Sequence, residues 1–151
     1  MFKRSKIWLP IIANSPPNPA DLFLDALITH PKQERLILAQ DICLKQMAQG
    51  RSLQIAEEFA HCFQGDCVNR LVRRVCILPK EYAENGNSIE SIVGGAKYWY
   101  HALEALLRST KHADHLLGRN DFFRQQKRIG VAYHYAPGTT YEHYYVILIS
   151  K

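Results

Sequence analysis

The last quarter of the chain constrains the fold more than any other stretch. Residues 128–136 read R-I-G-V-A-Y-H-Y-A, and nine residues from Tyr141 read Y-E-H-Y-Y-V-I-L-I. Aromatic and β-branched residues dominate both arms, and Pro137-Gly138 stands between them, which is typical of a β-hairpin. We therefore expect the chain to end in two antiparallel strands that contribute to the core.

Helices are predicted upstream of this hairpin. Asn18 is a good N-cap for a helix that runs to about Thr29. Residues 33–48 carry apolar side chains at helical spacing, and Gly50 is a plausible stop. Residues 91–107 read as a third, long helix. The sequence therefore predicts a mixed chain of helices followed by strands.

Two histidines stand just before the hairpin. Residues 109–117 read S-T-K-H-A-D-H-L-L, so His112 and His115 are three positions apart. On a helix this spacing places both imidazoles on one face. We therefore expect a histidine pair next to the core hairpin.

Length and composition fit one globular domain. The chain has 151 residues, 47% of them hydrophobic and 22% charged, which is enough for a single core. Residues 1–18 are predicted to be an N-terminal arm or a signal-like segment, because three basic residues precede a short apolar run. Residues 19–151 are predicted to form the domain. No apolar run approaches the roughly 20 residues of a membrane span.

The charge balance favours anionic partners. The net charge is +5, and a basic protein is attracted to membrane surfaces, cell-wall polymers or nucleic acid. The basic residues are scattered apart from one cluster of Arg70, Arg73 and Arg74. No basic motif with interleaved aromatic residues is present, so the sequence does not favour nucleic acid.

The four cysteines are Cys43, Cys62, Cys67 and Cys76. An even count allows two disulfides in three connectivities. If the protein is exported, at least one bridge is expected among the last three. The C-x4-C spacing is not that of a structural zinc site, and buried free thiols are the alternative.

Several motifs occur in a recognisable order. They are Phe59-Ala60-His61, Glu84-Asn85, Ser109-x-x-His112 and Ile129-Gly130. This ordered set resembles the CAP superfamily in its bacterial, SCP-like form. That superfamily contains cysteine-rich secretory proteins, insect venom allergens and plant pathogenesis-related proteins. The chain departs from the pattern at Leu106, where a tryptophan is usual, and lacks the usual Asn-x-x-Arg of the first helix.

The resemblance implies an α+β fold, namely an α-β-α sandwich. A central, largely antiparallel sheet would carry helices on both faces and end in the hairpin. Residues 19–151 would then be a single CAP domain that works outside the cell or in the cell envelope. The layer order follows from the resemblance alone, whereas the mixture of helices and strands follows from the residues.

The resemblance also implies a site. In the family, two histidines and two acidic residues converge in a surface cleft. Carried over by motif, they are His61, Glu84 and His112, with Ser109 where the second acid would stand and His115 at the rim. These residues would bind a ligand, and His61, Glu84 and His112 would be the catalytic groups of an enzyme.

The trio of His61, Glu84 and His112 is also a reasonable zinc-ligand set, because two imidazoles and a carboxylate leave one position open. The carboxylate of Glu84 has a second possible role, which is to orient an imidazole. The alternative without metal or ligand is a polar network that pins the helices to the sheet.

Three functions remain open at this point. The first is an extracellular or cell-envelope module that binds a lipid, glycan or protein in the cleft. The second is a metal-dependent, peptidase-like hydrolase that uses the same cleft. The third is a polyanion-binding module built on the arginine cluster. A serine hydrolase using Ser109 and His112 is disfavoured because no G-x-S-x-G motif is present.

Overall fold

The computed structural model describes residues 17–151. The predicted N-terminal arm or signal-like segment falls almost wholly on residues 1–16, which lie outside the described residues. None of the described helices is both long and apolar enough to cross a membrane.

Helices and short strands precede the final hairpin along the chain. The helices are α2 (Pro19–Ile28), α3 (Ile42–Glu57), α4 (Val68–Arg73), α5 (Trp99–Leu107), α6 (Thr110–Leu117) and α7 (Asp121–Arg124). The strands are β1 (Ala39–Gln40), β2 (Cys62–Phe63), β3 (Asp66–Cys67), β4 (Glu90–Gly94), β5 (Arg128–Tyr135) and β6 (His143–Ser150).

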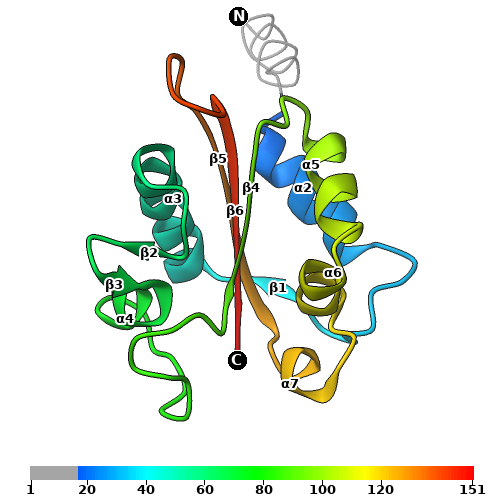
Figure 1. Ribbon diagram of the computed structural model, residues 1–151. Coiled ribbons are helices and arrows are strands. Elements are labelled where there is room, and N and C mark those ends of the chain that lie inside the picture. The colour runs from blue at the N-terminus through cyan, green and yellow to red at the C-terminus, as the bar shows by residue number, and fades with distance from the viewer. Residues whose placement is uncertain (1–16) are drawn as a thin grey trace, which may run out of the picture.

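A four-stranded sheet forms the middle of the molecule, with strand order β1-β5-β6-β4. Only β1 runs parallel to its neighbour, while β5, β6 and β4 are antiparallel to one another. Helices α3 and α4 lie on one face, and α2, α5 and α6 lie on the other (Figure 1). The predicted α-β-α sandwich with a largely antiparallel sheet is therefore confirmed.

The C-terminal hairpin forms as the sequence predicts. Strands β5 and β6 pair along their whole length, from Arg128 opposite Ser150 to Tyr135 opposite His143. Gly138 takes a positive φ of 84° in the connecting turn, a conformation that glycine adopts without strain. Residues Tyr144 to Ser150 of β6 are all buried, because helices cover both faces of this central strand.

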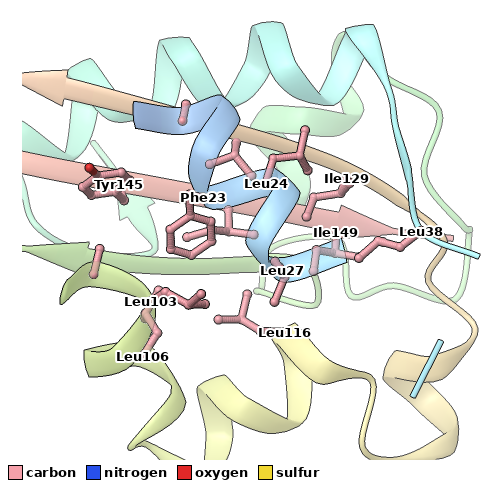
Figure 2. Close-up of a cluster of buried hydrophobic side chains, with 14 of the residues drawn as sticks. Phe23, Leu24, Leu27, Leu38, Leu103, Leu106, Leu116, Ile129, Tyr145 and Ile149 are labelled. Atoms are coloured by element: carbon pink, nitrogen blue, oxygen red, sulfur yellow. The ribbon is translucent and has the colours of Figure 1, made fainter. Parts of the chain in front are cut away.

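Two hydrophobic clusters fill the spaces between the sheet and its two helix layers. Figure 2 shows the cluster on the α2, α5 and α6 side, where Phe23 and Leu27 of α2 meet Tyr145 and Ile149 of β6. The second cluster joins α3 and α4 to the opposite face of the same strands. Strand β6 alternates between the two clusters, as the two-residue period of a strand requires.

Gly130 of β5 sets how closely α3 approaches the sheet. A Cβ atom at this position would overlap the carbonyl group of Leu44 and the backbone nitrogen of Lys45. The helix backbone therefore rests directly on the strand. This contact gives the Ile129-Gly130 motif a physical role in packing.

The helix predicted over residues 33–48 is wrong at both ends. The chain is irregular before β1, and α3 begins at Ile42, where the Asp41 side chain accepts a hydrogen bond from the Leu44 backbone N–H at 2.9 Å. The helix then continues through Gly50 to Glu57. Apolar Leu36, which helped to give the segment helical spacing, is fully exposed.

The helix predicted over residues 91–107 is only half right. Residues 90–94 form strand β4, and α5 begins at Trp99. Gly94 lies under the ring of Tyr141, where a Cβ would meet the ring at 2.8 Å, and Gly95 has φ 90°. The two glycines thus lie at the end of a strand and not within a helix.

Both pairs of cysteines are bridged. One disulfide joins Cys43 to Cys76 and the other joins Cys62 to Cys67. The expectation of at least one bridge among Cys62, Cys67 and Cys76 is confirmed. The long-range bridge ties α3 to the segment that follows α4, and the short one closes the β2–β3 hairpin.

Candidate functional site

A cavity of about 310 Å³ lies where β4 begins. Its walls come from both helix layers, because His61 precedes β2 on one side and α6 and α7 lie on the other. We call it the β4 cleft. It is lined by His61, Asn87, Ser88, Ile89, Glu90, Ser91, Lys111, His112, His115 and Phe123.

Glu90 is the buried carboxylate of the β4 cleft. It is 5% exposed and forms a two-pronged ion pair with Arg51 of α3, at 2.7 Å from Nε to Oε2 and 2.9 Å from Nη2 to Oε1. Arg51 is itself 1% exposed and also donates to Gln54 and to the Ala60 carbonyl. Because a buried charge needs a partner, Glu90 and Arg51 hold each other in place.

His61 completes this group. Its Nδ1 lies 3.0 Å from Glu90 Oε1, and a carboxylate can only accept, so Nδ1 carries the proton. The Nε2 atom is then left free to accept or to exchange a proton. The His61 side chain is 40% exposed, so it connects the buried ion pair to solvent. A carboxylate that orients an imidazole in this way is an arrangement able to move a proton.

Asn87 anchors the backbone that carries Glu90. Its Oδ1 accepts hydrogen bonds from the backbone N–H groups of Glu90 at 2.8 Å and Ile89 at 3.1 Å. Its Nδ2 donates to the Glu90 carbonyl at 3.0 Å. The side chain of Asn87 therefore fixes the point at which the loop becomes β4.

His112 and His115 reach the β4 cleft from the same face of α6, as their spacing predicts. Burial lowers the pKa of His112, and the nearby His61 lowers it further. His61 and His112 line the same cleft although they come from opposite helix layers. A pKa below the usual value keeps His112 neutral at pH 7.

His115 is the most deeply placed of the three histidines. It is 4% exposed, and its Nδ1 lies 2.7 Å from the Ser91 hydroxyl. Burial, followed by the charge of Arg35, lowers its pKa to about 3, while the Ile149 carbonyl acts in the opposite direction. Its Nε2 has no hydrogen-bond partner of good geometry within residues 17–151. His115 is therefore a neutral wall of the cleft with one polar atom unsatisfied.

Arg35 positions α6 and α7 around the β4 cleft. This buried arginine donates to the carbonyls of His115 at 2.6 Å, Leu116 at 2.9 Å and Gln126 at 2.6 Å. Burial lowers its pKa to about 10, so the guanidinium stays charged at neutral pH. It occupies the carbonyls at the C-terminal end of α6, where a cation is favoured.

Glu84 does not join the other predicted site residues. It is exposed and lies 3.2 Å from Arg73 and 3.8 Å from Arg70. The predicted set of His61, Glu84 and His112 is therefore not brought together, and Glu90 occupies the place expected for the acid. Within residues 17–151, no group of three or more His, Cys, Asp or Glu side chains is arranged to hold a metal ion.

Asn85, the second residue of the Glu-Asn motif, has a structural role. Its Oδ1 accepts from the Cys67 backbone N–H at 2.6 Å, and its Nδ2 donates to the Gly65 carbonyl at 3.3 Å. The motif therefore holds the disulfide-closed β2–β3 hairpin against the loop that leads to β4. His61 immediately precedes this hairpin, so Asn85 acts on the cleft indirectly.

Ser109 lies outside the lining of the β4 cleft. It occupies the N-cap position of α6, and its side chain makes no capping hydrogen bond. Its carbonyl accepts from the Ala113 N–H at 2.8 Å and so starts the helix that carries His112 and His115.

The three arginines of the basic cluster are paired with two acidic neighbours, Asp66 and Glu84. Arg70 and Arg74 pair with Asp66 at 3.3 and 3.0 Å, and Arg73 pairs with Glu84 at 3.2 Å. These contacts leave little free positive charge for a polyanion. The arginines hold α4 to the segments on either side of it.

Sequence reasoning missed Glu90 and Arg51. The sequence predicts a helix over residues 91–107, so Glu90 lies just before the predicted helix and has no predicted structural surroundings. The available signal was the pair of glycines at positions 94 and 95, which break a helix. An arginine in the middle of a helix usually faces solvent, so nothing local marked Arg51 as buried.

Comparison with known proteins identifies the fold. No family profile and no curated protein matches the chain. Among the solved structures that do match is an outer surface protein from Borrelia burgdorferi, with a TM-score of 0.64 and 18% identity, over 87% of this chain and 90% of that one. Another is an extracellular protein containing an SCP domain from Bacillus anthracis, with a TM-score of 0.60 and 21% identity. This second match covers 88% of this chain and 40% of the Bacillus protein. The chain therefore has an SCP-like fold, as its motifs predicted.

Proposed function

We propose that this protein is an SCP-like binding domain that works outside the cytoplasm and holds a polar group of its ligand in the β4 cleft. The fold is common to the chain and to two solved proteins, an outer surface protein and an extracellular protein. The two disulfides support the same location, because such bridges persist in oxidising compartments.

The main support for a binding role is that some polar groups of the cleft are held by hydrogen bonds while others have no partner among the described residues. Arg51 and His61 satisfy Glu90, and Ser91 is bonded to His115. Within residues 17–151, the side-chain groups that remain without a hydrogen-bond partner are His61 Nε2 and the imidazole of neutral His112. These fixed donors and acceptors suit recognition of a polar ligand, because a preorganised site loses little entropy on binding.

Catalysis has weaker support. The hydroxyl of Ser91 is hydrogen-bonded to His115, and the hydroxyl of Ser88 accepts a hydrogen bond from Asn69, so both serine side chains of the cleft have structural partners. The predicted zinc set does not fit, because Glu84 lies elsewhere and both oxygens of Glu90 are already bonded. Zinc binding is a prediction that no observation tests, and within residues 17–151 no three-ligand group is arranged to hold the ion, so no reaction step is assigned to it. Lipid, glycan and protein ligands remain the proposed classes.

A direct test follows the histidine ring signals by NMR while small polar probes are added. The probes are acetate, inorganic phosphate, N-acetylglucosamine and N-acetylglycine amide, which represent carboxylate, phosphate, sugar and peptide groups. We expect at least one probe to shift the ring signals of His61 and His112 in a saturable manner. His112→Ala should abolish the shift at His61.

The matched control is His101→Ala, which removes an exposed histidine from α5 and should leave the probe's effect unchanged. If none of the four probes gives a saturable shift at either ring, the cleft is a structural polar network and the proposed function fails. If the same shift persists in His112→Ala, the probe binds elsewhere and the β4 cleft loses its assignment.

A further inference from the structure

One edge of the sheet runs into the β4 cleft. Strand β4 is the last in the order β1-β5-β6-β4, so it has a neighbour on one side only. In Figure 1 it crosses in front of β6, between the two helix layers. Backbone groups in an antiparallel strand alternate between the two sides, so every second residue of β4 faces the open edge.

Two hydrogen bonds settle which residues face that edge. The Ile149 N–H donates to the Ile89 carbonyl, and the Gly95 N–H donates to the His143 carbonyl. Odd-numbered residues of this segment therefore point toward β6. The backbone N–H and C=O groups of Glu90, Ile92 and Gly94 point away from it.

Along this edge of the described chain, the backbone groups of Glu90 are hydrogen-bonded, whereas those of the later residues are not. The carboxamide of Asn87 accepts from the Glu90 N–H and donates to the Glu90 carbonyl, as the peptide group of a neighbouring strand would. The corresponding backbone groups of Ile92 and Gly94 have no partner among residues 17–151. Unpaired edge groups of this kind are a template for another strand.

Aromatic side chains border the open edge on the α3 side. The ring of Tyr141 lies over Gly94 and packs against Phe59 with 4.8 Å between ring centroids. Both side chains are about two-fifths exposed, at 42% and 41%. On the other face, α5 and α6 pack against β4. The edge therefore lies between an aromatic wall and a helical wall.

We infer that the ligand is an extended polypeptide, which adds to β4 as a fifth strand at Ile92 and Gly94 and reaches into the β4 cleft at its Asn87 end. Peptides offer alternating donors and acceptors at two-residue intervals, which match those two residues. Lipids and glycans have no such repeat. Side chains that alternate along the added strand would contact Phe59 and Tyr141, and the residue nearest Asn87 would meet His61 and His112.

This inference rests on the proposed function for the cleft. It is tested separately by measuring the hydrogen–deuterium exchange of backbone amides in β4. In the free full-length protein, the amides of Ile92 and Gly94 should exchange with deuterium at least tenfold faster than those of Ser91 and Val93. A synthetic mixture of random octapeptides should slow the exchange of Ile92 and Gly94 and leave Ser91 and Val93 unchanged. The same mixture with every backbone amide N-methylated should have no effect, because it has no backbone N–H to donate along either edge.

A variant pair tests the aromatic wall. Phe59→Ala should weaken the protection given by the octapeptides severalfold, whereas Tyr135→Ala, which removes an exposed tyrosine from the end of β5, should not change it. Equal weakening in both variants would contradict the assigned path of the peptide.

Two results would overturn the inference. If Ile92 and Gly94 are already protected in the free protein, the edge of β4 is not available to a peptide and the inference fails. If the octapeptides give no protection while a small probe still shifts His61 and His112, the strand-addition proposal fails and the binding role of the cleft stands. Failure of both experiments removes both proposals.

Discussion

At the scale of single residues, the β4 cleft depends on buried polar groups that hold one another in fixed states. His115 is the clearest case, because burial lowers its pKa to about 3. The unfolded chain takes up a proton on this residue below about pH 6.5, whereas the folded chain does not. The folded state is therefore stabilised above pH 6.5 and progressively loses that stability as the pH falls toward 3.

We expect the free energy of unfolding to fall by about 2 kcal/mol between pH 6.5 and pH 5 through His115 alone, at 1.36 kcal/mol per pH unit. Denaturant unfolding at pH 7.5 and pH 5 measures this loss. His115→Gln has no titrating group at this position, so its stability should depend less on pH by the same amount. An identical pH dependence in the two proteins would show that His115 can be protonated in the folded state.

At the scale of elements, the sequence predicted the hairpin, whose strand and turn signals are local, and did not predict strand β4, which depends on distant pairing. The hairpin was predictable because both arms and the Pro137-Gly138 turn carry strand and turn signals in sequence. Strand β4 was not predictable in the same way, because residues 91–93 are equally compatible with a buried helix. Residues 90–94 form a strand because they pair with β6, which lies about fifty residues further along the chain. Glu90 was missed with the strand that carries it.

The contact between α3 and β5 depends on one glycine. Gly130→Ala should destabilise the protein by about 3 kcal/mol, the upper part of the range for overpacking, because the new methyl group would overlap the backbone of Leu44 and Lys45. Gly50→Ala is the matched control, since it adds the same atom in open space within α3 and should stabilise by about 1 kcal/mol. Urea unfolding compares the two variants. A loss at Gly130 of under 1 kcal/mol would show that α3 can move away from the sheet at little cost.

At the scale of the whole molecule, the two disulfides constrain the chain unequally. Cys43 and Cys76 are 33 residues apart, whereas Cys62 and Cys67 are 5 apart. In the chain-entropy account, the longer loop contributes about 4 kcal/mol and the shorter about 2 kcal/mol. Replacing both cysteines of each pair with alanine and measuring denaturant unfolding should give losses in that order. A larger loss from the short loop would show that Cys62–Cys67 acts through the native β2–β3 hairpin and the neighbouring His61.

The central claim is that chain segments far apart in sequence bring His61, Glu90 and His112 together in one cleft, and that Glu84 is not part of it. The most direct measurement is the pKa of His112, followed by NMR through its ring protons. In the wild type it should lie below 6.5, because the residue is partly buried and shares the cleft with His61. His61→Gln should raise the pKa of His112 toward its ordinary value by removing the neighbouring charge, and Glu84→Gln should leave it unchanged. A His112 pKa that responds to Glu84→Gln and not to His61→Gln would contradict this account of the cleft.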